Sequence, residues 1–155
     1  MANYKRLFLA GHSYYLTVVT HQRKPLLVEH IELLRESFRE SKSYYSYEID
    51  AIVVLPDHIH MIITPEISTD YPKIVRAIKY NFSTKLVGCD CYRTDEEQSF
   101  SRYRRGLKTI WQKRYYEHTI RDEKDYFRCL EYMQNNPVKH GLVEEMKEWE
   151  YSSFV

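Results

Sequence analysis

The clearest pattern of hydrophobic and polar positions lies in the middle of the chain and predicts a β-hairpin. Two segments rich in β-branched residues, 49–55 (IDAIVVL) and 58–64 (HIHMIIT), flank a Pro-Asp pair that is typical of turns. Because side chains alternate along a strand, His58 and His60 are expected on one face and the residues that alternate with them on the other. The first segment is apolar on both faces, which is typical of a central strand in a covered sheet.

Hydrophobic spacing elsewhere predicts further strands and helices. The expected strands outside the hairpin are residues 13–20 and 109–120, and the expected helices are residues 31–41, 71–87 and 122–136. Pro137 is expected to end the last helix, and residues 88–106, which show no periodicity, are expected to form a long loop. The order of elements predicts one α+β domain over residues 1–155. Its expected architecture is a ferredoxin-like antiparallel sheet with helices packed on one face and the two histidines on a central strand.

Composition fits an ordinary soluble globular protein, with 43% hydrophobic and 29% charged residues. Neither a segment long enough to span a membrane nor a secretory signal is evident, so no membrane contact is expected. The three cysteines are too few and too irregular for a disulfide framework, which favours a reducing, cytoplasmic setting. Cys89-Asp90-Cys91 lacks a second pair at zinc-site spacing, so a zinc site there is disfavoured.

Charge is distributed unevenly, although the net charge is only +1. Residues 102–114 contain six basic side chains and no acidic one, which predicts contacts with phosphates. These residues are Arg102, Arg104, Arg105, Lys108, Lys113 and Arg114. A second basic set on the predicted helix 71–87 (Lys73, Arg76 and Lys79) fits a solvated face and a phosphate-binding face equally well. The 15 tyrosines add little, because tyrosine both stacks on bases and fills sheet cores.

Candidate chemistry lies in the histidine pair and in the last predicted helix. Imidazoles are common metal ligands, but a His-x-His pair is also often structural, and two nitrogens do not hold a catalytic ion alone. Tyr132 and Asn136 lie one turn apart on the shoulder of the apolar stripe of the helix. They could act as nucleophile and metal ligand if this helix docks over the histidines. From the residues alone, a packing tyrosine and a helix-ending asparagine are favoured.

Four segments resemble the signature blocks of the single-tyrosine HuH transposases, and within them the REP-associated tyrosine transposase branch. The segments are residues 55–60 (LPDHIH), 110–118 (IWQKRYYEH), 120–122 (IRD) and 131–141 (EYMQNNPVKHG). The likeness extends over nearly the whole chain, from about Tyr4 to Phe154. The blocks together are much more specific than the histidine pair.

The resemblance implies a metal-dependent DNA strand transferase that cleaves and rejoins single strands carrying imperfect, REP-like hairpins. His58 and His60 match the HuH pair and are implied to bind Mg²⁺ or Mn²⁺. Tyr132 matches the nucleophile that forms a 5′-phosphotyrosine link and frees a 3′-hydroxyl. The third metal ligand falls on Asn136, where some relatives carry glutamine.

Other implications concern DNA contacts and assembly. Lys5 and Arg6 are implied to contact DNA next to the hairpin. A homodimer that exchanges tyrosine helices and a monomer acting in cis are equally compatible with the chain, and a cytoplasmic, nucleoid-associated bacterial protein is expected. Two alternatives stay open, a non-catalytic ferredoxin-like nucleic-acid-binding module and a small metal-dependent hydrolase acting on another phosphodiester.

Overall fold

A four-stranded antiparallel sheet with strand order β2-β3-β1-β4 forms the centre of the structure. The computed structural model describes residues 6–88 and 110–154. The strands are β1 (Tyr14–Val19), β2 (Tyr47–Val54), β3 (His58–Pro65) and β4 (Tyr116–Thr119). This order, with a helix after β1 and another after β3, is the ferredoxin-like arrangement, so the predicted α+β antiparallel fold is confirmed.

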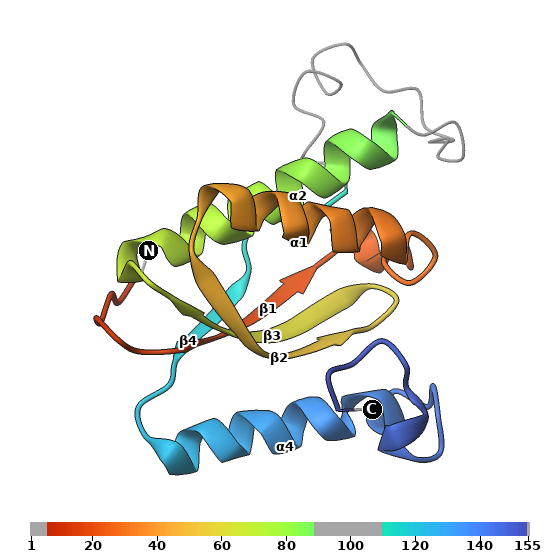
Figure 1. The fold of residues 1–155 in the computed structure, drawn as a ribbon. Coiled ribbons are helices and arrows are strands. Elements are labelled where there is room, and N and C mark those ends of the chain that lie inside the picture. Colours follow the sequence, from red (N-terminus) through yellow and green to blue (C-terminus); the bar gives the residue numbers. More distant parts are fainter. Residues whose placement is uncertain (1–5, 89–109, 155) are drawn as a thin grey trace, which may run out of the picture.

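The helices cover both faces of the sheet, and the prediction that they pack on one face is wrong in this respect. In the described ranges the α-helices are α1 (Ile31–Tyr44), α2 (Tyr71–Val87) and α4 (Glu123–Lys139). Short 3₁₀ turns at His21–Arg23 and Ser68–Asp70 precede α1 and α2, and another at Met146–Glu148 follows α4. Helices α1 and α2 lie together on one face, whereas α4 lies alone on the other (Figure 1). Because β2 and β3 are apolar on both faces, each face needs its own covering layer.

Side-chain alternation along β3 divides the core into two clusters and confirms the predicted orientation of the histidine strand. Ile59 and Met61 join the cluster beneath α1 and α2, while Ile62 joins the cluster beneath α4. Strand β3 pairs with β1 and β2, and His60 lies between Thr17 on one side and Val53 on the other. The two histidines are therefore on a central strand and on the face that α4 covers.

Helix α4 begins where the sequence predicts but continues past Pro137. Asp122 caps it, because its carboxylate accepts a hydrogen bond of 2.8 Å from the backbone N–H of Asp125. Pro137 was expected to end the helix, yet α4 extends to Lys139. In the last turn a proline removes only one helical hydrogen bond, and the carbonyl of Asn136 still accepts from the N–H of His140 at 3.0 Å. The helix ends before Gly141, which has the left-handed φ of 70°.

The predicted fourth strand is shorter in the structure, and the predicted loop lies outside the described residues. Only residues 116–119 pair with β1, and Trp111 makes an isolated bridge to Thr20. Trp111 is fully enclosed, so it packs in the core and is not a stacking platform for bases. Residues 89–109, which include most of the expected loop over 88–106, are not described.

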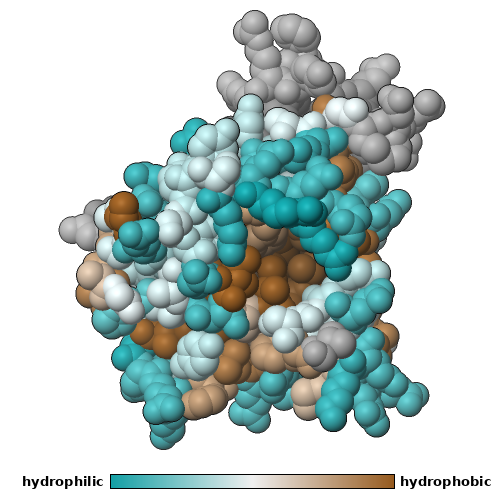
Figure 2. All heavy atoms as spheres, in the orientation of Figure 1, coloured by the Kyte–Doolittle hydropathy of each residue, from teal (hydrophilic) through white to brown (hydrophobic). Residues whose placement is uncertain are grey.

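The C-terminal segment closes the end of β2 and borders an apolar hollow. The indole N–H of Trp149 donates a 2.9 Å hydrogen bond to the carbonyl of Val54, and Ser152 pairs with Val53. Figure 2 shows apolar side chains gathered in a hollow between α1 and β2, a cavity of about 420 Å³ lined in part by Leu34 and Ile52. Within the described ranges, every helix is too short or too polar to cross a membrane.

Candidate active site

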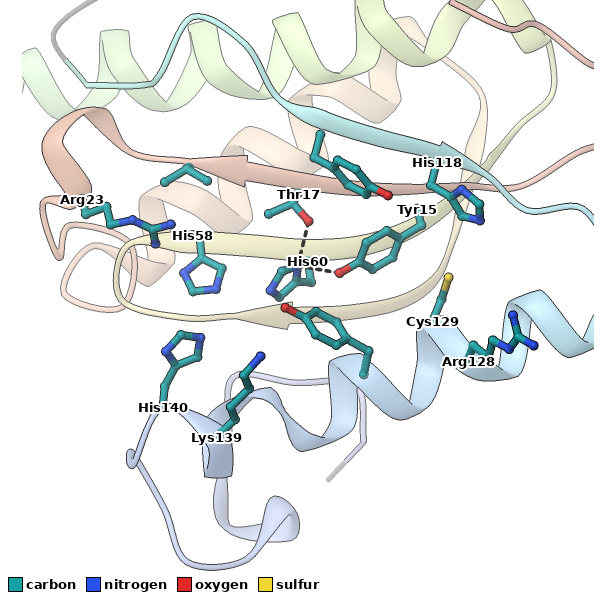
Figure 3. Close-up of a pocket in the computed structure, with 13 residues that line it drawn as sticks. Tyr15, Thr17, Arg23, His58, His60, His118, Arg128, Cys129, Lys139 and His140 are labelled. Carbon is teal, nitrogen blue, oxygen red and sulfur yellow. Dashed lines mark hydrogen bonds between the residues drawn. The ribbon is translucent and has the colours of Figure 1, made fainter.

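The two histidines line a pocket between the sheet and α4. The pocket has a volume of about 560 Å³, and Figure 3 shows His58 and His60 side by side on the strand that forms its floor. Their ring centroids are 4.8 Å apart and the ring planes are nearly perpendicular. Both residues are buried, at 5% and 4% exposure, so neighbouring side chains restrict the orientation of the two rings.

His60 is fixed by two hydroxyl groups of β1 and has a free nitrogen. Its Nδ1 lies 2.8 Å from the Tyr15 hydroxyl and 2.9 Å from Thr17 Oγ1, whereas its buried Nε2 has no hydrogen-bond partner among the described residues. Burial, followed by the nearby His58 and His140 imidazoles, lowers the pKa of His60 to about 3. The ring is therefore neutral near pH 7. A neutral imidazole whose Nδ1–H donates to a hydroxyl presents the Nε2 lone pair to a metal ion.

His58 is oriented by a carboxylate. Its Nδ1 lies 2.6 Å from Asp57 Oδ1, and the other carboxylate oxygen lies 3.3 Å from the guanidinium of Arg23. Burial alone would raise the pKa of Asp57, but the hydrogen bond and charge of His58, together with Arg23, bring that pKa below its usual value. The charged Asp57 favours a proton on His58 Nδ1. A carboxylate–histidine pair of this kind is typical of metal ligands, because it fixes the tautomer that leaves Nε2 available.

Asn136 brings an unsatisfied amide to the same place. Its side chain is 1% exposed and lies beside the His60 imidazole. Neither its oxygen nor its nitrogen has a hydrogen-bond partner in the part of the chain that the structure describes. A buried amide without partners destabilises a fold by about 1–3 kcal/mol. Such a group beside an orphaned His60 Nε2 fits a site that a ligand completes, and one nitrogen and one oxygen donor suit a divalent cation.

Tyr132 lies at the rim of the pocket on the same helix. Its side chain is 47% exposed, and its ring packs edge-on against His60 at a centroid distance of 5.5 Å and against Tyr15 at 6.5 Å. The Lys139 ammonium lies 5.2 Å from the centre of the Tyr132 ring. The structure thus brings together the four residues singled out from sequence as nucleophile and metal ligands. All four belong to the same chain.

The predicted DNA-contacting residues lie elsewhere or outside the described residues. Lys5, Arg102, Arg104, Arg105 and Lys108 are not described. Arg6 and the exposed Lys113 line a separate cavity of about 650 Å³, to which α2 contributes Lys73, Arg76 and Lys79. Arg114 is exposed nearby in sequence but is not among the lining residues.

Among the basic groups of this second cavity, Lys79 is partly buried, whereas Arg6, Lys73, Arg76 and Lys113 are exposed. Arg6 lies 3.4 Å from Glu117 and 5.3 Å from the centre of the Tyr115 ring. Lys79 donates a 3.0 Å hydrogen bond to the carbonyl of Gln112. Burial, and then the charge of Arg6, lowers the pKa of Lys79 to about 8. Lys79 is therefore not an ordinary solvated lysine, which weighs against a fully solvated face for the basic side chains of α2.

Several pocket residues were not identified from sequence. Tyr15 and Thr17 are held against His60 by the pairing of β1 with β3, and this register could not be read from the chain. Asp57, directly before the first histidine, was assigned to the turn alone. Lys139 and His140 line the pocket, and the His140 ring lies 5.3 Å from that of His58. Their place on the pocket was not predicted, because the helix was expected to end before Pro137 and instead extends to Lys139.

A phenol beside two imidazoles and a buried amide defines the class of the site: a nucleophile next to a place for a divalent cation, as in phosphoryl-transfer enzymes. The family model described as "Transposase IS200 like" matches residues 9–136, and the chain belongs to this family. Membership makes the protein a transposase, in a class that cleaves DNA and transfers strands. The sequence-based family assignment is confirmed, and the non-catalytic module is disfavoured.

Individual relatives agree with the family assignment. The chain is 38% identical to a putative REP-associated tyrosine transposase of Haemophilus influenzae, covering 99% of this chain and 86% of that protein. It is 35% identical to the REP-associated tyrosine transposase of Escherichia coli, covering 99% and 83%. A solved structure of such a transposase bound to a REP hairpin superposes with a TM-score of 0.78 at 33% identity, covering 99% and 83%.

Proposed function

We propose that this protein cleaves and rejoins single-stranded DNA next to a REP-like hairpin, with Tyr132 as the nucleophile. The observation that carries the proposal is the position of Tyr132 on the pocket that His58 and His60 also line, with the buried Asn136 amide beside His60. The solved relative bound to a REP hairpin supports a hairpin-bearing substrate. The basic cavity around Arg6 and Lys79 supports additional contacts with DNA phosphates.

We further propose that His58, His60 and Asn136 hold the divalent ion. Metal dependence is general in this family. When bound, a hard cation such as Mn²⁺ or Mg²⁺ withdraws charge from the scissile phosphate and orients it for in-line attack. Two nitrogens and one oxygen favour Mn²⁺, because Mg²⁺ prefers oxygen ligands throughout.

The residues of the chain account for the remaining steps. The Tyr132 phenol releases its proton to solvent, and its oxygen bonds to phosphorus as the bond to the 3′-oxygen breaks. The departing 3′-oxygen takes up a proton, leaving a 5′-phosphotyrosine and a free 3′-hydroxyl. The Lys139 ammonium, 5.2 Å from the centre of the Tyr132 ring, adds positive charge beside the place where the phosphate is attacked. Because one phosphodiester replaces another, a second 3′-hydroxyl can reverse the step without ATP.

A monomer acting in cis is the assembly that this arrangement favours, because the tyrosine lies on the pocket of its own chain. Mixing an inactive His58→Ala/His60→Ala chain with an inactive Tyr132→Phe chain tests this. We expect no recovery of cleavage, whereas restored cleavage would mean that a partner supplies the tyrosine. Because the substrate is DNA, we place the protein at the nucleoid in the bacterial cytoplasm.

The decisive experiment incubates the protein with Mn²⁺ and an end-labelled single strand carrying a hairpin, and separates the products on a denaturing gel. We expect a covalent protein–DNA adduct that Tyr132→Phe abolishes while hairpin binding persists. Binding without cleavage by the wild-type protein would favour the non-catalytic module. Cleavage that survives Tyr132→Phe would favour a hydrolase and refute the covalent mechanism.

A further inference from the structure

A second group of metal-ligand types lies on α4 and β4, outside the proposed transferase site. It consists of His118 from β4 and of Asp125 and Cys129 from α4, and one ligand atom from each lies within 4.8 Å of the other two. Figure 3 shows the His118 ring and the Cys129 thiol facing each other between the strand and the helix. No role has been given to any of these side chains in the strand-transfer chemistry.

The local structure explains why these three groups converge. Asp125 and Cys129 are four residues apart and therefore share one face of α4. His118 is paired with Tyr15 across β1 and β4, so it lies on the face of the sheet that α4 covers. The backbone N–H of Arg121 donates to Asp125 Oδ2 at 2.9 Å, and His118 Nε2 lies 2.8 Å from the same oxygen. The carboxylate is thus fixed toward the imidazole before any ligand arrives.

The chemistry of the set selects a particular class of ion. One imidazole nitrogen, one carboxylate oxygen and one thiolate sulfur are the donors that Zn²⁺ uses, and a thiolate disfavours Mg²⁺ and Ca²⁺. His118 and Cys129 also line the 560 Å³ pocket, so an ion can reach them from solvent. Zn²⁺ in proteins commonly takes a fourth ligand, which water or a phosphate oxygen would supply here. These features distinguish the group from a simple His–Asp pair beside a packing cysteine.

We propose that His118, Asp125 and Cys129 bind one Zn²⁺ ion that joins β4 to the first half of α4. Binding replaces the hydrogen bond between His118 and Asp125, so the proton on His118 Nε2 moves to Nδ1. The Cys129 thiol releases its proton to solvent, which leaves a thiolate on the metal. Tyr132 follows Asp125 by two helical turns on the same side of α4, so the ion fixes the helix that carries the nucleophile. The proposal does not depend on the strand-transfer function.

The test uses metal-stripped full-length protein with Zn²⁺ or Co²⁺ alone. A His58→Ala/His60→Ala variant removes the other candidate metal site and is the background for every measurement. We expect one Zn²⁺ per chain after dialysis, a rise in melting temperature, and a thiolate-to-cobalt charge-transfer band with Co²⁺. Cys129→Ala should abolish the band, and His118→Gln should weaken Zn²⁺ binding by more than the roughly 10–100-fold typical of losing an outer-shell partner.

Matched thiols in the same chain sharpen the result. A Cys89→Ser/Cys91→Ser variant should keep the cobalt band and the Zn²⁺ stoichiometry, because neither cysteine belongs to the proposed site. Failure of the background variant to take up Zn²⁺ would overturn the proposal. So would a band that follows Cys89 and Cys91 and not Cys129. Because His118 lies on β4, His118→Gln leaves the sequence of α4 intact and remains informative if Cys129→Ala folds poorly.

Discussion

Replacing Asn136 with leucine separates stability from activity at the proposed metal site. The side chain is 1% exposed, and neither amide atom has a hydrogen-bond partner among the described residues. Leucine has a similar size and no polar atoms, so it removes the unsatisfied amide without leaving a large cavity. The metal-free variant should therefore be more stable than the wild type, although its cleavage activity should be lost.

The expected gain follows from the cost of the buried amide. Burying such a group without partners destabilises the fold by about 1–3 kcal/mol, and leucine relieves that cost. In a chain of this length each kcal/mol changes the melting temperature by roughly 2–4 °C, so the increase should be about 2–12 °C. Saturating Mn²⁺ should narrow the difference, because only the wild type gains stability from a ligand that uses the amide oxygen.

Thermal unfolding with and without Mn²⁺ measures both effects, and the labelled-hairpin gel measures cleavage. Asn135→Leu is the matched control, because Asn135 is the preceding residue and is exposed. It should leave the melting temperature and the activity nearly unchanged. A metal-free Asn136→Leu protein that melts below the wild type would refute the reasoning, since the amide would then be contributing to stability. Full cleavage by this variant would remove Asn136 from the metal site.

Three further predictions concern the groups around the histidines and the tyrosine. Tyr15→Phe removes a hydroxyl 2.8 Å from His60 Nδ1 and should weaken Mn²⁺ binding about 10–100-fold in calorimetry. Tyr116→Phe is the control and should leave the affinity unchanged. Equal Mn²⁺ affinities of Tyr15→Phe and the wild type would refute the role of Tyr15 in orienting His60. Lys139→Met should slow cleavage about tenfold, because it removes a positive charge 5.2 Å from the centre of the Tyr132 ring, beside the phosphate on which negative charge develops. The exposed Lys124→Met is the control, and an unchanged rate would show that the Lys139 ammonium takes no part in the reaction. His60 has a pKa of about 3 in the folded protein against an ordinary 6.5, so the unfolded chain takes up a proton at His60 first and the free energy of unfolding should fall as the pH is lowered from 6.5 to 3. His60→Phe should make the free energy of unfolding less dependent on pH in this range. An unchanged pH dependence would contradict a neutral buried imidazole.

The position of the histidines was predictable because strand alternation is a local property. Once residues 58–64 are a strand, His58 and His60 must share a face, and the apolar residues that alternate with them need a core. The face that α4 would cover was not predictable in the same way. Hydrophobic spacing shows that a helix has an apolar side but not which side of the sheet it meets. Amphipathic helices can pack against a sheet that is apolar on both faces in more than one arrangement.

Contacts that depend on strand register were also beyond the sequence. The hydroxyls of Tyr15 and Thr17 reach His60 only because β1 pairs antiparallel with β3 in one particular register. Which strand pairs with which, and in what register, depends on long-range contacts that cannot be predicted from the residues of one strand. Pro137 illustrates a different difficulty, because a local rule predicted that the helix ends near this proline but placed the end three residues too early. Lys139 and His140 were overlooked for that reason.

Both proposed metal sites depend on how α4 lies against the sheet. The C-terminal half of the helix supplies Asn136 beside His60, and the N-terminal half supplies Asp125 and Cys129 opposite His118. Tyr15 lies between the two groups, because its hydroxyl is hydrogen-bonded to His60 and its backbone lies opposite His118 in the pairing of β1 with β4. A rotation or shift of α4 would displace metal ligands in both sites. An ion bound at one site therefore restricts the movements of α4 that would separate the ligands of the other. Binding free energies are reciprocal, and Zn²⁺ at His118 should therefore tighten Mn²⁺ binding at His58 and His60 by the same factor that Mn²⁺ tightens Zn²⁺ binding.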